Sequence, residues 1–365
     1  MKITDVTLTL HRWDMPRTAY SEAAGGTRQV GVVTIQTDEG VEGHAFLGSS
    51  LYGADELAPQ VLGRLKPAVL GRNPLDIGAI WQDLWARHRR VQPPSICAVD
   101  VALWDIAGKV AGLPIHRLIG TCREKVPAYA SSASMGDPQQ YVEEALGFRQ
   151  RGWTAYKIHP RKDPTRDVEI CAAVKAAVGD SMVLMLDAMW AYGYLEALRV
   201  GRAIQELGFH WYEDPLAEDD LYNYVKLKQQ LSIPILATEY GPTALPEYVP
   251  WILQQATDML RGDVAVKGGL TPMIKLAHLA EAFRMKCEIH HGGNSLNNVA
   301  NLHLTMAIPN CDYFEVLLPD EAQKHGLVRD IEVDHEGFVH APTAPGLGYE
   351  IDWELIRRNT IDVLR

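Results

Sequence analysis

The sequence predicts an α/β protein built as a modified (β/α)8 TIM-like barrel with an N-terminal α+β capping domain. Three observations support this fold. The first 50 residues alternate apolar and polar positions, the next segment has helical spacing, and after Cys122 short apolar runs that end in polar residues recur every 24 to 28 residues. A chain of 365 residues also suits two domains, at about 150 residues per domain.

Residues 1–125 are expected to form the capping domain. Three segments have the alternation of a small antiparallel sheet, at residues 3–10, 30–37 and 41–47. A glycine-bearing loop at residues 15–26 joins the first two strands and is long enough to cover a site. Helical spacing follows, with apolar residues three and four positions apart.

Residues 126–340 are expected to form the barrel, because one strand, one crossover helix and two loops occupy the observed interval. The eight candidate strands are 126–131, 155–159, 182–187, 211–213, 233–239, 259–263, 287–290 and 313–315. An open doubly wound sheet is the alternative, but the sequence has no GxGxxG or GxxxxGK[ST] motif. Residues 341–365 are expected to leave the barrel and pack back on the capping domain.

Composition excludes several classes of protein. The net charge of −11 disfavours nucleic acid and anionic membranes as partners. No apolar run reaches the roughly 18 residues of a membrane span, and the N-terminus lacks the apolar core of a signal peptide. Five cysteines without a CxxC pair indicate neither a disulfide framework nor a zinc knuckle. We therefore expect a cytoplasmic protein.

The polar residues at the strand ends are the candidate site, because the carboxyl ends of barrel strands converge on one mouth. They are Lys157, His159, Asp187, Glu213, Glu239, Asp263, His290 and Glu315. Five carboxylates in one cleft repel one another and call for a cation. Asp187, Glu213 and Glu239 come from three consecutive strands and offer an all-oxygen ligand set, which suits Mg²⁺, whereas zinc prefers histidine or cysteine.

His290 is the candidate general base. Asp263 lies at the end of the preceding strand, where its carboxylate would fix the imidazole tautomer and raise its basicity. His291 competes for this position, but neighbouring side chains of a strand point in opposite directions, so only one of the two histidines faces the mouth. The 27-residue step from Asp263 favours His290.

Lys157 and His159 share one face of the second strand and are expected to point at the site from the side opposite His290. Glu315 is expected either to exchange a proton or to anchor a basic neighbour. Asp214, which follows Glu213 and precedes Pro215, is interpreted as structural.

In this order the motifs resemble the mandelate racemase subgroup of the enolase superfamily. They are Leu-Met-Leu-Asp-Ala around Asp187, Trp-Tyr-Glu-Asp-Pro around Glu213, Ala-Thr-Glu ending at Glu239, and Asp263-Val-Ala-Val-Lys-Gly-Gly-Leu-Thr271 followed by His290. The resemblance implies that the three acids bind Mg²⁺, that His290 and Asp263 form an acid/base dyad, and that Glu315 hydrogen-bonds the substrate carboxylate.

Two positions depart from the family pattern. Many relatives have Lys-x-Lys on the second strand, whereas this chain has Lys157-Ile158-His159, so a histidine stands where the second lysine would act. Muconate cycloisomerase relatives use a lysine on the sixth strand. Lys267 lies four residues past Asp263 and is interpreted as a loop lysine instead.

The chemistry implied by the resemblance is removal of the proton next to a carboxylate through an enediolate. We expect an acid-sugar dehydratase that converts an aldonate or aldarate to a 2-keto-3-deoxy acid. A racemase or epimerase is the first alternative, because His159 and His290 would suit two-base proton transfer. A lactone cycloisomerase and a non-catalytic metal- or sugar-binding protein are the others.

The substrate is expected to be a small carboxylate whose far end meets the loops at residues 20–28 and 48–52. Arg28 and Tyr52 are the candidate substrate contacts in these loops. Family resemblance alone also implies a homo-oligomer.

Overall fold

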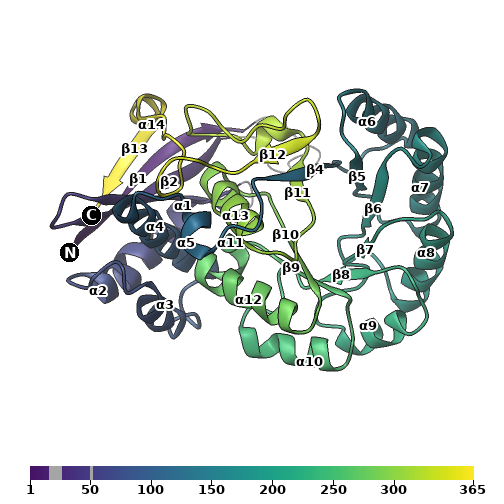
Figure 1. Ribbon diagram of the computed structural model, residues 1–365, viewed down its shortest axis with the longest axis horizontal. Helices are drawn as coiled ribbons and strands as arrows, with labels where there is room; N and C mark the ends of the chain where they lie inside the picture. The colour runs from purple at the N-terminus through teal and green to yellow at the C-terminus, as the bar shows by residue number, and fades with distance from the viewer. Residues whose placement is uncertain (16–26, 50–51) are drawn as a thin grey trace.

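The computed structural model describes residues 1–15, 27–49 and 52–365. It shows a smaller unit that holds both chain termini beside a ring of strands surrounded by helices (Figure 1). The expected modified barrel with a separate antiparallel N-terminal sheet is therefore confirmed.

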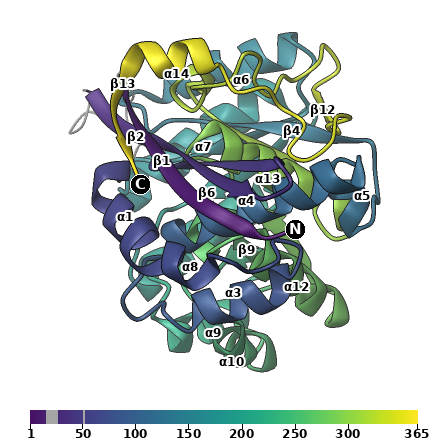
Figure 2. The same ribbon diagram turned by 90° about the vertical axis from the view of Figure 1, so that its left-hand side faces the viewer.

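The capping domain is built on a four-stranded antiparallel sheet in the order β13-β1-β2-β3 (Figure 2). Its strands are β1 (Ile3–Asp14), β2 (Thr27–Thr37), β3 (Glu42–Leu47) and β13 (Thr360–Leu364). β1 keeps the predicted alternation over its first part, because Val6 and Leu8 are buried between more exposed neighbours. Both β1 and β2 are longer than predicted, since their pairing continues to Asp14 and Thr27.

One long helix joins the capping sheet to the barrel. The helices of this domain are α1 (Ala54–Gln60), η2 (Val61–Leu65), α2 (Lys66–Val69), α3 (Ile77–Trp85), α4 (Pro93–Ala111) and α5 (Ile115–Ile119). In α4, Asp105 accepts the backbone N–H of His44 in β3, and Asp100 accepts the backbone N–H and hydroxyl of Thr271 in the barrel. These buried bonds fix the sheet against the barrel.

All eight predicted barrel strands are present. They are β4 (Lys125–Ser131), β5 (Ala155–Ile158), β6 (Val183–Asp187), β7 (Tyr212–Glu213), β8 (Ile235–Ala237), β9 (Met259–Gly262), β10 (Lys286–Ile289) and β11 (Phe314–Leu317). They pair in parallel in the order β10-β9-β8-β7-β6-β5-β4-β11, and β12 (Phe338–His340) adds an antiparallel partner to β4. Within the described ranges β10 and β11 do not pair, so the barrel is nearly closed rather than closed.

Helices cover the outside of the barrel. They are α6 (Pro138–Gln150), α7 (Pro164–Val178), α8 (Tyr194–Glu206), α9 (Leu221–Lys228), η3 (Leu245–Glu247), α10 (Tyr248–Leu253), α11 (Val264–Lys267), α12 (Leu270–Ala282) and α13 (Ser295–Ala307). Asp137 and Asp163 cap α6 and α7, each just before a proline in the first turn. Among the helices described, none has both the length and the apolar character needed to cross a membrane.

After β11 the chain does not add another barrel helix. It passes through η4 (Asp320–Ala322) and β12, and then reaches α14 (Trp353–Asn359) and β13. α14 lies against β1, and β13 pairs with β1 from Leu8 to His11. The last residues of the chain thus complete the sheet that the first residues begin.

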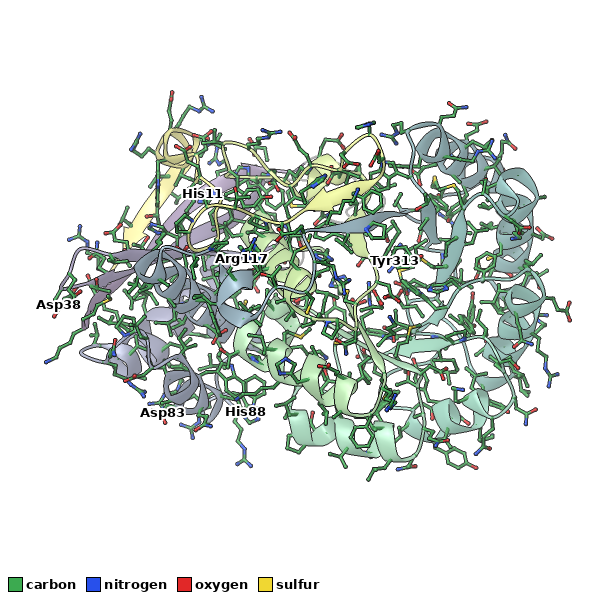
Figure 3. The ribbon with its side chains drawn as sticks, viewed as in Figure 1. His11, Asp38, Asp83, His88, Arg117 and Tyr313 are labelled. Atoms are coloured by element: carbon green, nitrogen blue, oxygen red, sulfur yellow. The ribbon has the colours of Figure 1, made fainter. Side chains whose placement is uncertain are left out.

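The barrel interior is divided into an apolar floor and a polar mouth. Tyr129, Trp211 and Tyr313 make edge-to-face ring contacts inside the barrel, with centroids 5.6 to 6.1 Å apart. Figure 3 shows Tyr313 within the ring of strands. Trp211 and Tyr313 each precede their strand, so this aromatic floor fills the amino end and leaves the carboxyl ends for polar side chains.

Candidate active site

The eight predicted site residues come from the seven strands β5 to β11. Seven of them lie in the last two residues of their strand or just after it, and Glu315 is the second residue of β11. A cavity of about 400 Å³ opens at this end of the barrel. Five of the eight line it, namely His159, Asp187, Glu239, His290 and Glu315. Lys157 and Asp263 lie behind this lining and contact its side chains, and Glu213 contacts Lys157 and Arg261 behind it.

Asp187, Glu213 and Glu239 are brought together as the predicted ligand set. One carboxylate oxygen from each lies within 4.8 Å of the others, and all three residues are buried. Asp187 and Glu213 are the last residues of paired strands, which sets their spacing. Burial, with the charges of Asp187 and Glu315, raises the pKa of Glu213. Three buried oxygen donors that repel one another fit Mg²⁺, whose charge relieves that repulsion.

Lys157 supplies positive charge beneath these carboxylates. Its Nζ lies 3.3 Å from Asp187, 3.0 Å from Glu213 and 2.7 Å from Glu315, and the side chain is fully buried. Burial and the nearby Arg261 lower the pKa of Lys157, but Glu213 and Glu315 outweigh them and hold it well above its usual value. Lys157 therefore stays protonated and neutralises carboxylates rather than accepting a proton.

Arg261 is a site residue that the sequence interpretation missed. This fully buried arginine of β9 contacts Glu213 at 2.5 Å, Glu239 at 3.1 Å and Glu315 at 2.6 Å. The predicted excess of carboxylates is therefore balanced in part by the chain itself. Strand alternation is the signal that could have found it, because Arg261 precedes Asp263 by two positions.

The His290 and Asp263 pair forms as expected. Nδ1 of His290 lies 2.6 Å from Oδ2 of Asp263, and Nε2 lies 3.5 Å from Glu239. Asp263 is itself held, because its Oδ1 accepts the backbone N–H of Val266 as the cap of α11. Burial lowers the pKa of His290, but Glu239 and Asp263 raise it to a net value of about 9.

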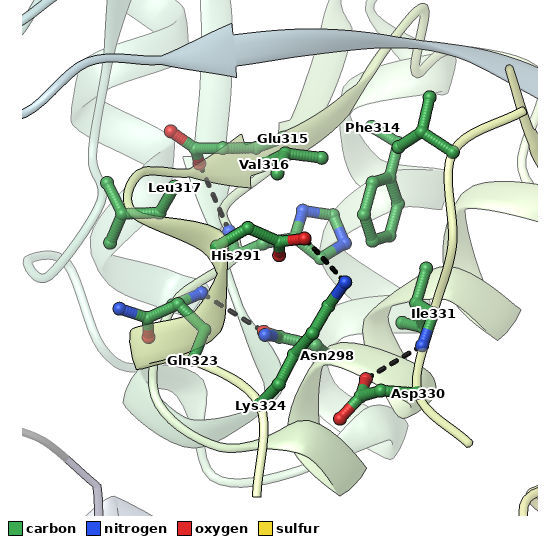
Figure 4. A pocket seen from close by; sticks show the side chains of 13 residues that line it. His291, Asn298, Phe314, Glu315, Val316, Leu317, Gln323, Lys324, Asp330 and Ile331 are labelled. Carbon is green, nitrogen blue, oxygen red and sulfur yellow. Dashed lines mark hydrogen bonds and ion pairs between the residues drawn. The ribbon is translucent and has the colours of Figure 1, made fainter. Parts of the chain in front are cut away.

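His291 turns away from the cavity, as alternation predicted. It is buried in a separate pocket with Asn298 and Lys324, and its ring packs on Phe314 at 3.9 Å (Figure 4). Burial lowers the pKa of His291 to about 3, so the ring is neutral. Its backbone N–H donates to Glu315 at 3.1 Å, which gives this histidine a role in holding a site carboxylate.

His159 faces His290 across the cavity, five strands away in the sheet order. Its Nε2 lies 2.8 Å from Oδ2 of Asp187 and its Nδ1 lies 2.6 Å from the carbonyl of Ser132. Both ring nitrogens thus face oxygen atoms that can accept a hydrogen bond. His159 is therefore a candidate to exchange a proton with a group in the cavity.

The structural interpretation of Asp214 is wrong in one respect, because Asp214 also lines the cavity. β7 ends at Glu213, and Asp214 adopts φ of +40°, so the alternation of the strand no longer governs its direction. Its Oδ1 is buried and has no hydrogen-bond partner among the described residues. Burial, with the charges of Glu218, Glu239 and Asp187, raises the pKa of Asp214 well above its usual value.

Lys267 is not the loop lysine that was expected. It is the last residue of the short helix α11 and is almost completely buried. Its Nζ donates to the backbone carbonyls of Thr238, Tyr240 and Pro242 at 2.7 to 2.9 Å. The sequence could not show this, because the acceptors belong to the backbone of the segment after β8, where Glu239 also lies.

The two expected substrate contacts, Arg28 and Tyr52, are not among the described residues that line the cavity. Arg28 lies in β2 opposite Trp13. Tyr52 packs on the main apolar core, and burial, with the charges of Asp263 and Glu239, raises its pKa. Residues 20–26 and 50–51 of the two expected substrate loops lie outside the described residues. The substrate-binding roles of Arg28 and Tyr52 stay predictions.

Two family models cover most of the chain. The mandelate racemase / muconate lactonizing enzyme N-terminal domain matches residues 3–120. The model described as enolase C-terminal domain-like matches residues 140–355. The first match falls on the capping domain, and the second covers the barrel strands from β5 to β11.

Individual relatives extend the comparison. An arabinonate dehydratase of Saccharolobus solfataricus is 29% identical over 329 residues, with 87% of each chain covered. A 3,6-anhydro-alpha-L-galactonate cycloisomerase of Streptomyces coelicolor is 28% identical, with 98% of this chain and 99% of the relative covered. The crystal structure of a D-glucarate dehydratase from Agrobacterium tumefaciens complexed with magnesium superimposes with a TM-score of 0.91, at 34% identity over 99% of this chain and all of that one. The chain belongs to the mandelate racemase subgroup of the enolase superfamily.

Proposed function

We propose that this protein is a Mg²⁺-dependent acid-sugar dehydratase that forms a 2-keto-3-deoxy acid. The observation that carries the proposal is the pair of histidines on opposite walls of one cavity, His290 with its Asp263 partner and His159 near Ser132. The carboxylate cluster lies between them in the strand order. Dehydration needs one group to remove a proton and another to protonate the leaving hydroxyl.

His290 is placed to take the proton next to the substrate carboxylate. Its Nδ1 donates to Asp263, so Nε2, which lies 3.5 Å from Glu239, is the nitrogen that exchanges that proton. Mg²⁺ bound by Asp187, Glu213 and Glu239 would stabilise the negative charge that develops on the substrate carboxylate. The product of this step is an enediolate.

In this proposal His159 completes the elimination. It gives its Nε2 proton to the β-hydroxyl, the carbon–oxygen bond breaks, and water leaves. The resulting enol then takes a proton at the β-carbon and becomes the 2-keto-3-deoxy acid. Glu315 lines the same cavity, where burial raises its pKa but Arg261 and Lys157 outweigh burial, hold the pKa well below the usual value and keep Glu315 an anion.

The relatives support this assignment at the level of the reaction class. Two of the three proteins compared above are dehydratases, of arabinonate and of D-glucarate, and the third is a cycloisomerase. The magnesium in the D-glucarate dehydratase crystal supports the proposed metal.

A racemase or epimerase is the second candidate, and the same two histidines favour it. If His159 returned a proton to the α-carbon from the opposite face, the substrate would change configuration without losing water. The outcome depends on whether the group beside His159 is a β-hydroxyl or the α-carbon. The product of the wild type separates the two, because a dehydratase forms a keto acid whereas an epimerase forms the inverted acid without loss of water.

The test is a screen of the purified protein against a library of aldonates and aldarates with Mg²⁺, with keto-acid formation as the readout. We expect one or a few acids to give keto acid, and EDTA or His290→Asn to abolish it. Inversion without keto acid would favour the epimerase. The absence of both keto acid and α-proton exchange in D₂O with every acid would contradict the proposal.

A further inference from the structure

Part of the cavity wall is apolar. Met189, Trp190, Tyr240 and Leu317 lie on it, and the rings of Trp190 and Tyr240 meet edge to face at 5.5 Å. Such a wall suits the C–H face of a sugar chain more than its hydroxyl groups. Gln323 is a polar residue of this wall, but its Oε1 already accepts the backbone N–H of Gly293.

Lys162 is the exception on this wall. Among the described residues that line the cavity it is the only lysine or arginine, and it follows His159 by three positions in the segment between β5 and α7. The residue is exposed, and no ion pair or hydrogen bond of its ammonium group occurs within the described part of the chain. Its φ of +66° is a left-handed conformation that costs a non-glycine residue free energy.

Lys162 makes no ion pair with the described residues although the cavity contains several carboxylates, so its charge is available to a substrate. The nearby carboxylates are held by Lys157, Arg261 and the two histidines, and Lys162 makes none of those contacts. The whole chain carries a net charge of −11, which repels an anionic substrate, and a doubly charged one most strongly. A cation on the cavity wall offsets that repulsion for a substrate with a second negative group.

We propose that Lys162 forms a subsite for a second carboxylate, so that the substrate is a dicarboxylic acid sugar, an aldarate. This inference rests on the proposed function, which places the first carboxylate at the acidic cluster. An aldonate ends in a neutral hydroxymethyl group and gains little from an ammonium group. An aldarate ends in a carboxylate and gains a charge-assisted hydrogen bond.

The first experiment compares hexarates with the hexonates of matched configuration, such as D-glucarate with D-gluconate and galactarate with D-galactonate. We expect the protein to prefer the aldarate of the productive pair, and Lys162→Gln to reduce the ratio of the two kcat/KM values at least tenfold. Arg161→Gln is the matched control, because Arg161 is an exposed cation beside Lys162 that does not line the cavity. It should leave the ratio unchanged.

A binding measurement gives a readout that does not depend on turnover. Calorimetry with Mg²⁺ compares the His290→Asn variant with the double variant that also carries Lys162→Gln. The added substitution should raise the Kd of the aldarate at least tenfold and change the Kd of the aldonate much less. An unchanged ratio in Lys162→Gln, or a preference for the aldonate, would overturn this inference and leave the dehydratase proposal standing. Binding of neither acid, with no α-proton exchange, would overturn both.

Discussion

Nζ of Lys157 lies 2.7 Å from Oε1 of Glu315, although their strands β5 and β11 are separated by β4. The contact is part of a buried network of ion pairs at the candidate metal ligands, since Lys157 also contacts Asp187 and Glu213. Buried charges stabilise a fold only when each has its partners. Removing Lys157 should therefore affect folding and metal binding together.

We predict that Lys157→Met lowers the free energy of unfolding without Mg²⁺ by roughly 3 to 5 kcal/mol, because three buried carboxylates lose a cation. Chemical denaturation with and without Mg²⁺ measures this, and Mg²⁺ should stabilise the variant more than the wild type. Lys162→Met, at an exposed lysine, is the control and should change stability little. Equal free energies of unfolding for Lys157→Met and the wild type in EDTA would contradict the stabilising role of the Lys157 ion pairs.

A second prediction concerns pH and His303. This histidine of α13 is fully buried, its Nε2 donates to the carbonyl of Leu347, and its Nδ1 accepts the backbone N–H of His116. Burial lowers its pKa from 6.5 to about 3. The folded state therefore resists protonation, so the stability it contributes is complete above pH 6.5 and is lost as the pH falls toward 3.

Between pH 7 and pH 5 this shift corresponds to about 2 kcal/mol. Denaturation of the wild type and of His303→Gln at both pH values should show the variant losing less stability on acidification by about that amount. The comparison isolates His303 because the other buried histidines are unchanged. Parallel pH profiles for the two proteins would show that His303 does not resist protonation as the structure indicates.

Lys267 provides a third prediction. Its ammonium group holds three carbonyls of the segment that carries Glu239, and it lies on α11, whose cap is Asp263. Lys267→Met should weaken Mg²⁺ binding about tenfold or more, because three buried carbonyls lose a charged donor and release Glu239. Ammonium ions should restore part of the affinity by occupying the three oxygens, whereas tetramethylammonium should not. Wild-type Mg²⁺ affinity in the variant would show that Lys267 does not position the metal site.

The strand ends were predictable because parallel strands joined by crossover helices repeat at a nearly constant interval. That regularity found all eight strands and gathered Asp187, Glu213 and Glu239 into one cluster. Alternation also separated His290 from His291 correctly. These features depend on backbone periodicity, which a single sequence carries.

The other site residues are positioned by turns and loops, whose conformation does not follow a repeating sequence pattern. Asp214 enters the cavity because the chain turns to a positive φ after β7, and Lys267 reaches carbonyls that have no side-chain signature. β8 ends at Ala237, so Glu239 is placed by a loop in which Thr238 has φ of +83°. Lys162 and Trp190 come from connecting segments with positive φ as well.

The most direct test of the account is a deuterium-exchange measurement with Mg²⁺ and the acid that the library screen identifies. In D₂O, His159→Asn should return substrate labelled at the α-carbon with little keto acid, because His290 still removes the proton while the hydroxyl lacks a donor. His290→Asn should give neither label nor product. Label incorporated by His290→Asn, or wild-type dehydration by His159→Asn, would contradict the assignment of the two histidines.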